Sequence, residues 1–163
     1  MKKINHTKNF ILVILFFLSG VVFILQNESV FAQTLSYSAE INKSFTPISI
    51  LPGQASRLKV TIYNPNTFPL TLGNPGWTDT LPPNVLFDPT NPNPTTNCTG
   101  GTVSVSVIDR TLSISGGTVP AKVGSTNGQC SVEINVTSTV SGNHINTIPS
   151  ENLQATKSDD STV

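Results

Sequence analysis

CTGGTVSVSVIDRTLSISGGTVPAKVGSTNGQC, residues 98–130, is the stretch that decides how this chain folds. It begins and ends with the only two cysteines in the protein. Apolar and polar residues alternate over residues 102–108, again over 111–115, and a third time over 130–136. Alternation with a period of two is typical of β-strands that have one buried and one solvent-exposed face. The stretch therefore predicts a small β unit that is tied at its ends.

The N-terminus has the three parts of a secretory signal peptide. Three lysines lie within the first eight residues, an apolar run covers residues 10–25, and the small residue Ala32 closes the segment. About 16 apolar residues are fewer than the roughly 20 that a membrane-spanning helix needs, although a retained anchor is the alternative. We therefore expect a helical signal peptide over residues 1–32, cleaved between Ala32 and Gln33, and a secreted or cell-surface protein.

The two cysteines are expected to form a disulfide. An exported chain meets an oxidising environment, in which an even number of cysteines most simply pairs. Two free thiols or a metal-binding pair are the alternatives, but the spacing lacks the close-set pattern of a zinc site. With roughly 30 residues between the partners, the bond contributes about 3 to 4 kcal/mol. We predict that it joins Cys98 to Cys130.

The charge of the exported part excludes two classes of partner. After residue 32 the chain has six basic and eight acidic side chains, a net charge of about −2. A nucleic-acid binder normally presents a basic face, and binding to anionic lipid needs a polybasic patch. We expect no nucleic-acid partner, and membrane contact only through the signal peptide before cleavage.

The rest of the chain reads as further strands separated by turns. Outside the signal segment no stretch has helical periodicity, whereas Pro52-Gly53 and other proline- or glycine-containing pairs recur as turn signals. The expected strands outside the cysteine-bounded stretch are 35–42, 48–51, 57–63, 70–72, 77–82, 85–87 and 145–148. We predict an all-β fold, an antiparallel β-sandwich of about seven strands over residues 33–155, with a polar tail at 156–163. Residues 88–97, rich in asparagine and proline, are expected to form a surface loop.

An ordered series of short motifs resembles a known family. They are Lys-Ser-Phe-Thr-Pro (43–47), Leu-Lys-Val-Thr-Ile-Tyr-Asn-Pro-Asn (58–66), Thr-Asp-Thr-Leu-Pro (78–82), Cys-Thr-Gly-Gly-Thr-Val (98–103) and Asn-Thr-Ile-Pro (146–149). The chain is similar over about residues 36–155 to bacterial cell-surface repeat domains of the group called domain of unknown function eleven, and to its immunoglobulin-like relatives. The resemblance implies an immunoglobulin-like fold on secreted or surface-attached proteins, with the cysteines joining neighbouring strands. It implies no activity, because fold alone does not determine function.

The sequence departs from this pattern at its end. Relatives usually continue with another alternating strand, whereas here Ala155 is followed by charged and hydroxyl side chains. A sheet edge without its last strand would be free to pair with another copy of the chain or with a partner strand.

Candidate catalytic residues are few. After residue 32 the chain has one histidine, His144, beside the turn signal Gly142-Asn143, and a Ser/His/Asp triad would have to use it. We interpret His144 as a turn residue, and a secreted hydrolase is the least favoured function. No phosphate loop, dinucleotide fingerprint or zinc-protease motif occurs. The sequence therefore predicts no enzyme, no catalytic residue and no cofactor.

The remaining polar residues could form a calcium site or an isopeptide bond. Calcium could use Asp79, Asp88 or Asp159-Asp160, but these do not form a calcium-loop cluster, so we expect no metal site and interpret Asp79 as a residue that holds a turn. A lysine–asparagine isopeptide bond, as in some surface adhesins, needs a buried lysine near a carboxylate. Lys59 is out of phase with its apolar neighbours and should face solvent, which leaves only Lys43 open.

The aromatic residues Trp77 and Tyr63 could form an exposed binding patch. A single tryptophan in a sandwich more often packs between the sheets, so we expect Trp77 in the core.

Together these observations predict a structural or adhesive domain at the bacterial envelope, with an envelope or cell-surface protein or a glycan as partner. The alternative is a small secreted binding module that takes a carbohydrate or peptide through loop 88–97 or a free sheet edge.

Overall fold

Each strand pair in the described part of the chain is antiparallel, as predicted from the sequence. The computed structural model describes residues 39–149 and 152–158, which belong to one unit, residues 36–163. The predicted signal peptide and its cleavage point at Ala32 and Gln33 lie outside the described residues. Within the described residues, no helix is long and apolar enough to cross a membrane. The fold is all-β with antiparallel sheets.

The largest sheet, sheet A, is built on two long strands. They are β2 (Ala55–Asn64) and β10 (Gly128–Thr137), and Cys130, Val132 and Ile134 of β10 stand opposite Ile62, Val60 and Leu58 of β2. The other members are β1 (Glu40–Thr46) on the free side of β2, and β5 (Leu86–Phe87) and β6 (Thr95–Thr96) on β10. Both long strands alternate as the sequence predicts, so one face of sheet A is apolar.

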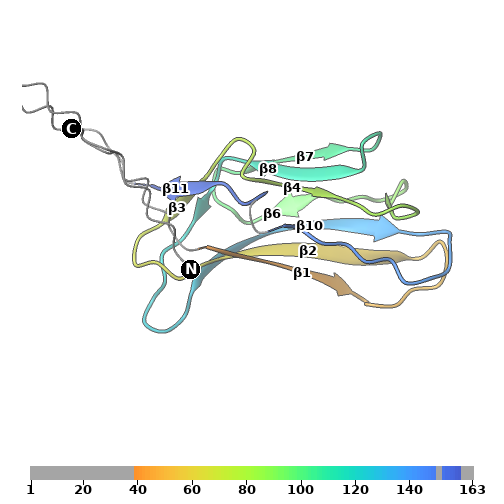
Figure 1. The fold of residues 1–163 in the computed structure, drawn as a ribbon, viewed down its shortest axis with the longest axis horizontal. Helices are drawn as coiled ribbons and strands as arrows, with labels where there is room; N and C mark the ends of the chain where they lie inside the picture. Colours follow the sequence, from red (N-terminus) through yellow and green to blue (C-terminus); the bar gives the residue numbers. More distant parts are fainter. Residues whose placement is uncertain (1–38, 150–151, 159–163) are drawn as a thin grey trace, which may run out of the picture. The chain divides into compact units, whose positions relative to one another are not determined.

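Two smaller sheets complete the fold. Sheet B has the order β11-β3-β9, from Ala155–Lys157, Leu70–Leu72 and Thr118–Val119. Sheet C has the order β4-β8-β7, from Trp77–Thr80, Thr111–Ser115 and Thr102–Ser106. Figure 1 shows β4, β8 and β7 on one side and β1, β2 and β10 on the other.

The apolar faces of the three sheets share one core. Trp77 is fully buried in it, which confirms the prediction of core packing, whereas Tyr63 is half-buried. Its main members are Leu58, Val60, Ile62, Leu70, Leu72, Trp77, Leu112, Ile114, Val119, Val132 and Ile134. Burying side chains from sheets that are distant in sequence is the main force that holds them together.

The predicted disulfide between Cys98 and Cys130 is present, and the strand register explains it. Thr96 of β6 pairs with Val132 of β10, and the antiparallel register places Cys98, two residues after Thr96, opposite Cys130, two residues before Val132. The Cα atoms of the two cysteines are 4.9 Å apart, within the range that a disulfide spans. Both cysteines are buried, as the phase of Cys130 predicts.

Three predicted strand segments are instead loops. Residues 48–51 lie between Pro47 and the Pro52-Gly53 turn, and residues 145–148 have no paired strand in the described part of the chain. Val107 and Ile108 belong to a four-residue turn that ends at Arg110, whose positive φ helps to reverse the chain. Most of their apolar side chains are consequently exposed, because turn geometry prevails over the local alternation: these are Ile48, Leu51, Val107, Ile108 and Ile145.

Among the predicted boundaries that differ from the structure, one lies at the end of the first strand and one at the C-terminal end of the domain. The first strand was expected over 35–42, but β1 continues to Thr46, so Lys43 lies within it. At the other end the prediction had no strand, but β11 (Ala155–Lys157) reaches two residues into the predicted polar tail at 156–163 and pairs with Leu70–Leu72. Threonine suits a strand, and three paired residues are enough to attach this segment to sheet B.

Candidate functional site

Three polar side chains that are far apart in the sequence meet inside the fold. Lys43 Nζ lies 2.7 Å from Asp79 Oδ1, and Asn146 Nδ2 donates a hydrogen bond to Asp79 Oδ2 at 3.0 Å. The Lys43 side chain is 9% exposed and the Asp79 side chain 0%. One carboxylate thus holds an amine and a primary amide at the same time. We call Lys43, Asp79 and Asn146 the buried triad.

Lys43 points inward because of its phase in β1. Ile41, Lys43 and Phe45 are the partly buried residues of this strand, and they alternate with exposed ones. Ile41 and Phe45 pack against the core on either side of the lysine. β1 is an edge strand of sheet A. From its inner face the Lys43 side chain extends to Asp79, which lies on β4 of sheet C.

Asp79 occupies a core position of β4. Its neighbours in phase are Trp77 and Leu81, and both are buried. The interpretation of Asp79 as a residue that holds a turn is therefore wrong, because the residue lies within a strand and its carboxylate faces the core. Its register partner is Leu112 of β8, which is also buried. An aspartate among such residues needs partners, since an unpaired buried charge is costly.

Asn146 comes from the segment that follows β10 and returns toward β11 (Figure 1). In the described part of the chain, residues 145–148 make no backbone hydrogen bond to a sheet. Ile148 packs against the core, and the Asn146 side chain binds Asp79. This segment is therefore held by side chains rather than by a strand ladder.

Burial dominates the electrostatics of the lysine. Loss of solvent lowers the pKa of Lys43, while the hydrogen bond and the charge of Asp79 oppose that decrease. The amine is thus more readily deprotonated here than in water. A neutral amine beside a carboxyl group and a carboxamide can transfer protons and act as a nucleophile.

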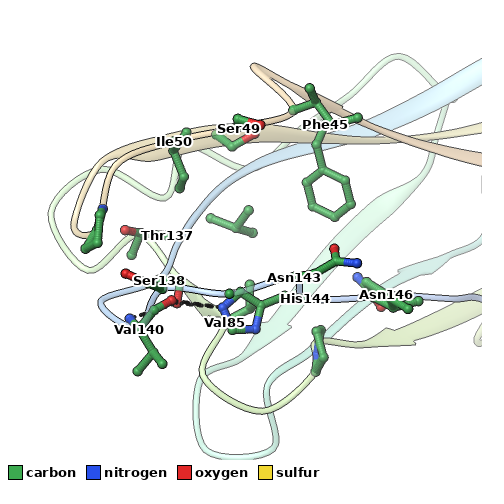
Figure 2. A pocket seen from close by; sticks show the side chains of 18 residues that line it. Phe45, Ser49, Ile50, Val85, Thr137, Ser138, Val140, Asn143, His144 and Asn146 are labelled. Atoms are coloured by element: carbon green, nitrogen blue, oxygen red, sulfur yellow. Dashed lines mark hydrogen bonds between the residues drawn. The ribbon is translucent and has the colours of Figure 1, made fainter.

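A hollow of about 680 Å³ adjoins the buried triad. Figure 2 shows the ring of Phe45 pointing into it from β1, with His144 and Asn146 on the opposite wall. Residues of the 47–52 loop and of the 137–146 segment form most of its lining. The hollow lies at the end of the sheets where the exposed side chains of Ile48 and Ile145 are found.

His144 closes a turn at this hollow. Its Nε2 lies 3.0 Å from the carbonyl oxygen of Val140 and 3.3 Å from Ser138 Oγ. The hydroxyl of Ser138 itself donates to the same carbonyl, and it accepts from the Val140 amide. A catalytic base must accept the serine proton, whereas here both groups point at one carbonyl. The geometry agrees with a turn residue.

Residues 88–94 form a surface loop beside β10, as predicted, but the prediction is wrong for Thr95 and Thr96, which form β6 and pair with β10. Asn135 binds the carbonyl oxygens of Asn91 and Pro92, and Arg57 binds Asn93 and Thr95. Asp88 begins the loop with a turn in which its carboxylate accepts from two backbone amides. The loop's polar groups are therefore largely engaged with the domain itself.

The other candidate residues are dispersed. Lys59 is exposed, as predicted, and pairs with Glu133 at 3.2 Å. Among residues 39–149 and 152–158, no group of three or more histidine, cysteine or acidic side chains could hold a metal ion. Asp159 and Asp160 lie outside the described residues.

Comparison with known families matches nearly all of this domain. The model of a family described as a domain of unknown function, DUF7933, matches residues 40–163. The chain belongs to this family. The DUF7933 match begins at the first residue of β1 and includes Lys43, Asp79 and Asn146. No curated protein matches the chain.

Two of the three residues of the buried triad could be recognised from the sequence. Lys43 continues the apolar phase of Ile41, and Asp79 shares the phase of Trp77, so each could have been recognised as an inward-facing charge. Asn146 lies outside any strand, and nothing local marks it. The packing of sheet A against sheet C, which brings the three together, is not encoded in any local pattern.

Proposed function

We propose that this DUF7933 domain is a secreted or cell-surface module with a structural or adhesive role and no catalytic activity on other molecules. Its partner would be an envelope or cell-surface protein or a glycan. The observation that carries the proposal is the buried Cys98–Cys130 disulfide in a chain whose first 32 residues have the pattern of a signal peptide. Disulfides persist in oxidising compartments and are rare in the cytosol.

The arrangement of sheets supports an immunoglobulin-like sandwich. Sheets A and C both contribute their apolar faces to one core, and the disulfide ties β10 to the segment that leads into β7. We propose that the domain is related in this way to the cell-surface repeat domains that its motifs resemble. Such a module has a structural or adhesive role and does not convert a substrate.

The location can be tested on intact cells that produce the full chain. A thiol reagent that adds a known mass should modify neither cysteine before reduction and both after it, and a membrane-impermeant amine label should reach Lys59 without lysis. Cysteines that react without reduction, in a chain that is labelled only after lysis, would contradict the proposal.

A second candidate function is the binding of a carbohydrate or peptide, and the hollow beside the buried triad favours it. The hollow is of the size that small ligands occupy, and it combines apolar walls with amide and hydroxyl groups. Loop 88–97, one of the two binding surfaces named in the alternative prediction, is less suited, because Arg57 and Asn135 occupy its polar groups.

A glycan array and a peptide array with the full chain distinguish the two functions. Saturable binding that Ile145→Ser and Asn143→Ala weaken, while Asn91→Ala does not, would establish the binding module. No saturable binding on either array would leave the structural role as the better account.

A further inference from the structure

We propose that Lys43 and Asn146 become joined by a covalent isopeptide bond, which the folded chain forms itself with Asp79 as the catalytic residue. The inference does not rest on the proposed function, since the reaction needs only the folded domain. It would make the buried triad a modification site and give the chain a chemical activity on itself.

The geometry places both reactants on one carboxylate. Asp79 Oδ1 contacts the lysine nitrogen at 2.7 Å, and Asp79 Oδ2 contacts the amide nitrogen of Asn146 at 3.0 Å. The reactants come from β1 and from the segment after β10, and folding alone brings them together. Holding two reactive groups in this way replaces an encounter in solution by a fixed geometry, which can greatly accelerate a reaction.

The surroundings of Lys43 and Asp79 favour reaction of the lysine amine. The side chains that flank the triad in phase are Ile41 and Phe45 on β1 and Trp77 with Leu81 at β4. Nearly all of the lysine side chain and all of the aspartate side chain are shielded from solvent. Burial of the lysine favours its neutral form, which is the form that reacts as a nucleophile.

The reaction balances without any other reagent. A proton first passes from the Lys43 ammonium to Asp79, which gives a neutral amine and a neutral carboxyl group. The amine attacks Asn146 Cγ, and the bond between Nζ and Cγ forms. Asp79 accepts one proton from Nζ at one oxygen and gives one to Nδ2 from the other, so the bond between Cγ and Nδ2 breaks and ammonia leaves. The products are a secondary amide and one ammonia.

The bond would close a very long loop. It would connect the edge strand β1 with the segment after β10, and the Cys98–Cys130 disulfide would lie inside that loop. Pulling force that enters the domain before Lys43 and leaves it after Asn146 would then bypass the sheets between them.

Peptide mapping of the full chain tests the proposal. After reduction and alkylation, trypsin cleaves at Arg57, Lys122 and Lys157, so Asn146 lies in fragment 123–157. We expect this fragment to be joined to the one that contains Lys43 and ends at Arg57, with no cleavage after Lys43. The joined species should weigh one ammonia, about 17 Da, less than its two parts together.

The mass of the intact chain alone does not decide the question. An N-terminal Gln33, if the signal peptide is cleaved there, and the Asn127-Gly128 pair can each lose ammonia as well. The joined fragments and their fragmentation spectrum identify the bond instead. Asn146→Ala and Lys43→Arg should both give separate fragments, while Lys59→Arg, which changes an exposed lysine, should still give the joined one.

The role of Asp79 is tested with Asp79→Ala, which keeps both reactants. In chains that have formed the disulfide, and are therefore folded, joined fragments should be lost or greatly reduced. If the wild-type chain yields separate fragments with an unmodified Lys43 and an unmodified Asn146, the triad is an ion pair only and the proposal is overturned. Joined fragments that persist in Asp79→Ala would overturn the catalytic role.

Discussion

Asp79 is the residue on which the interior of this domain depends most. It is a fully buried carboxylate whose two oxygens bind an amine and an amide. A buried charge that loses a partner retains the full cost of its lost hydration. If Asp79 is removed, Lys43 is the buried charge that loses its partner.

Replacement of Asp79 by alanine should therefore destabilise the domain by at least about 3 kcal/mol, because an ammonium would remain in a largely apolar site. The measurement is the midpoint of urea unfolding with intact disulfide. Asp109→Ala is the matched control, since Asp109 lies exposed in a turn and binds Ser106. Equal midpoints for the two variants would contradict this account of Asp79.

The lowered pKa of Glu133 should make the stability of the domain depend on pH. Partial desolvation raises its pKa, but the hydrogen bonds and charges of Lys59 and Arg57 together lower it below its ordinary value. A carboxyl group with a lowered pKa in the folded state stabilises above about pH 4.5, and that contribution is lost as the pH falls through the lowered pKa.

Glu133→Gln should consequently lower the free energy of unfolding by less than about 1 kcal/mol at neutral pH, and the loss should shrink in salt. In acid, below the lowered pKa, variant and wild type should converge. Unfolding curves across this range provide the check, and a difference that grows toward low pH would show that the sign is wrong.

Among the elements, β10 organises the fold. It pairs with β2 over its whole length, with β5 and β6 on its other side, and it carries one end of the disulfide. The first residue of the strand, Gly128, also allows the chain to pass close to the preceding loop.

Cys98→Ser with Cys130→Ser should lower the free energy of unfolding by about 3 kcal/mol, since the bond restricts the unfolded chain over the intervening loop. The melting temperature of the double variant should be clearly lower than that of the oxidised wild type. The wild type under reducing conditions serves as the control. No change in either case would show that the bond contributes nothing to stability.

Gly128→Ala should destabilise the domain by about 1 to 3 kcal/mol, because the added Cβ would overlap the carbonyl group of Pro120 and the backbone would have to shift. Gly124→Ala is the comparison. It has a positive φ but open space around it, so it should cost about 1 kcal/mol from backbone strain alone. Thermal unfolding would distinguish them, and an equal loss would argue against the close approach at Gly128.

The strands could be predicted where apolar and polar residues alternate over a long stretch. Residues 57–63 and 130–136 became the cores of β2 and β10, and the even pair of cysteines gave the disulfide. Residues 48–51 and 107–108 were misread, because apolar side chains in turns resemble short strands. The buried triad could not be derived, since it depends on how separate sheets pack and not on any one strand.

At the scale of the whole molecule, the proposed isopeptide bond would be the longest-range connection in the domain. The disulfide constrains a loop of about 30 residues, whereas a bond from Lys43 to Asn146 would constrain a loop of about 100. The entropy removed from the unfolded chain rises with loop length. We therefore expect Asn146 to contribute far more to the free energy of unfolding than one hydrogen bond does.

Asn146→Ala should lower the free energy of unfolding by about 4 to 5 kcal/mol, the value expected for opening a loop of that size. Asn143→Ala is the matched control, because this exposed asparagine lies in the same segment and lines the same hollow. Urea unfolding of the reduced proteins isolates the effect from the disulfide. A loss of about 1 kcal/mol for Asn146→Ala would correspond to a hydrogen bond alone.

Nuclear magnetic resonance of the folded full chain, with isotope-labelled lysine side-chain nitrogens, shows whether Lys43 and Asn146 are covalently joined. The account predicts one lysine nitrogen with an amide-type signal that correlates with the Asn146 side-chain carbonyl, and its absence from Asn146→Ala. If every lysine nitrogen in the folded wild type gives an amine signal, the bond does not exist and the claim is contradicted.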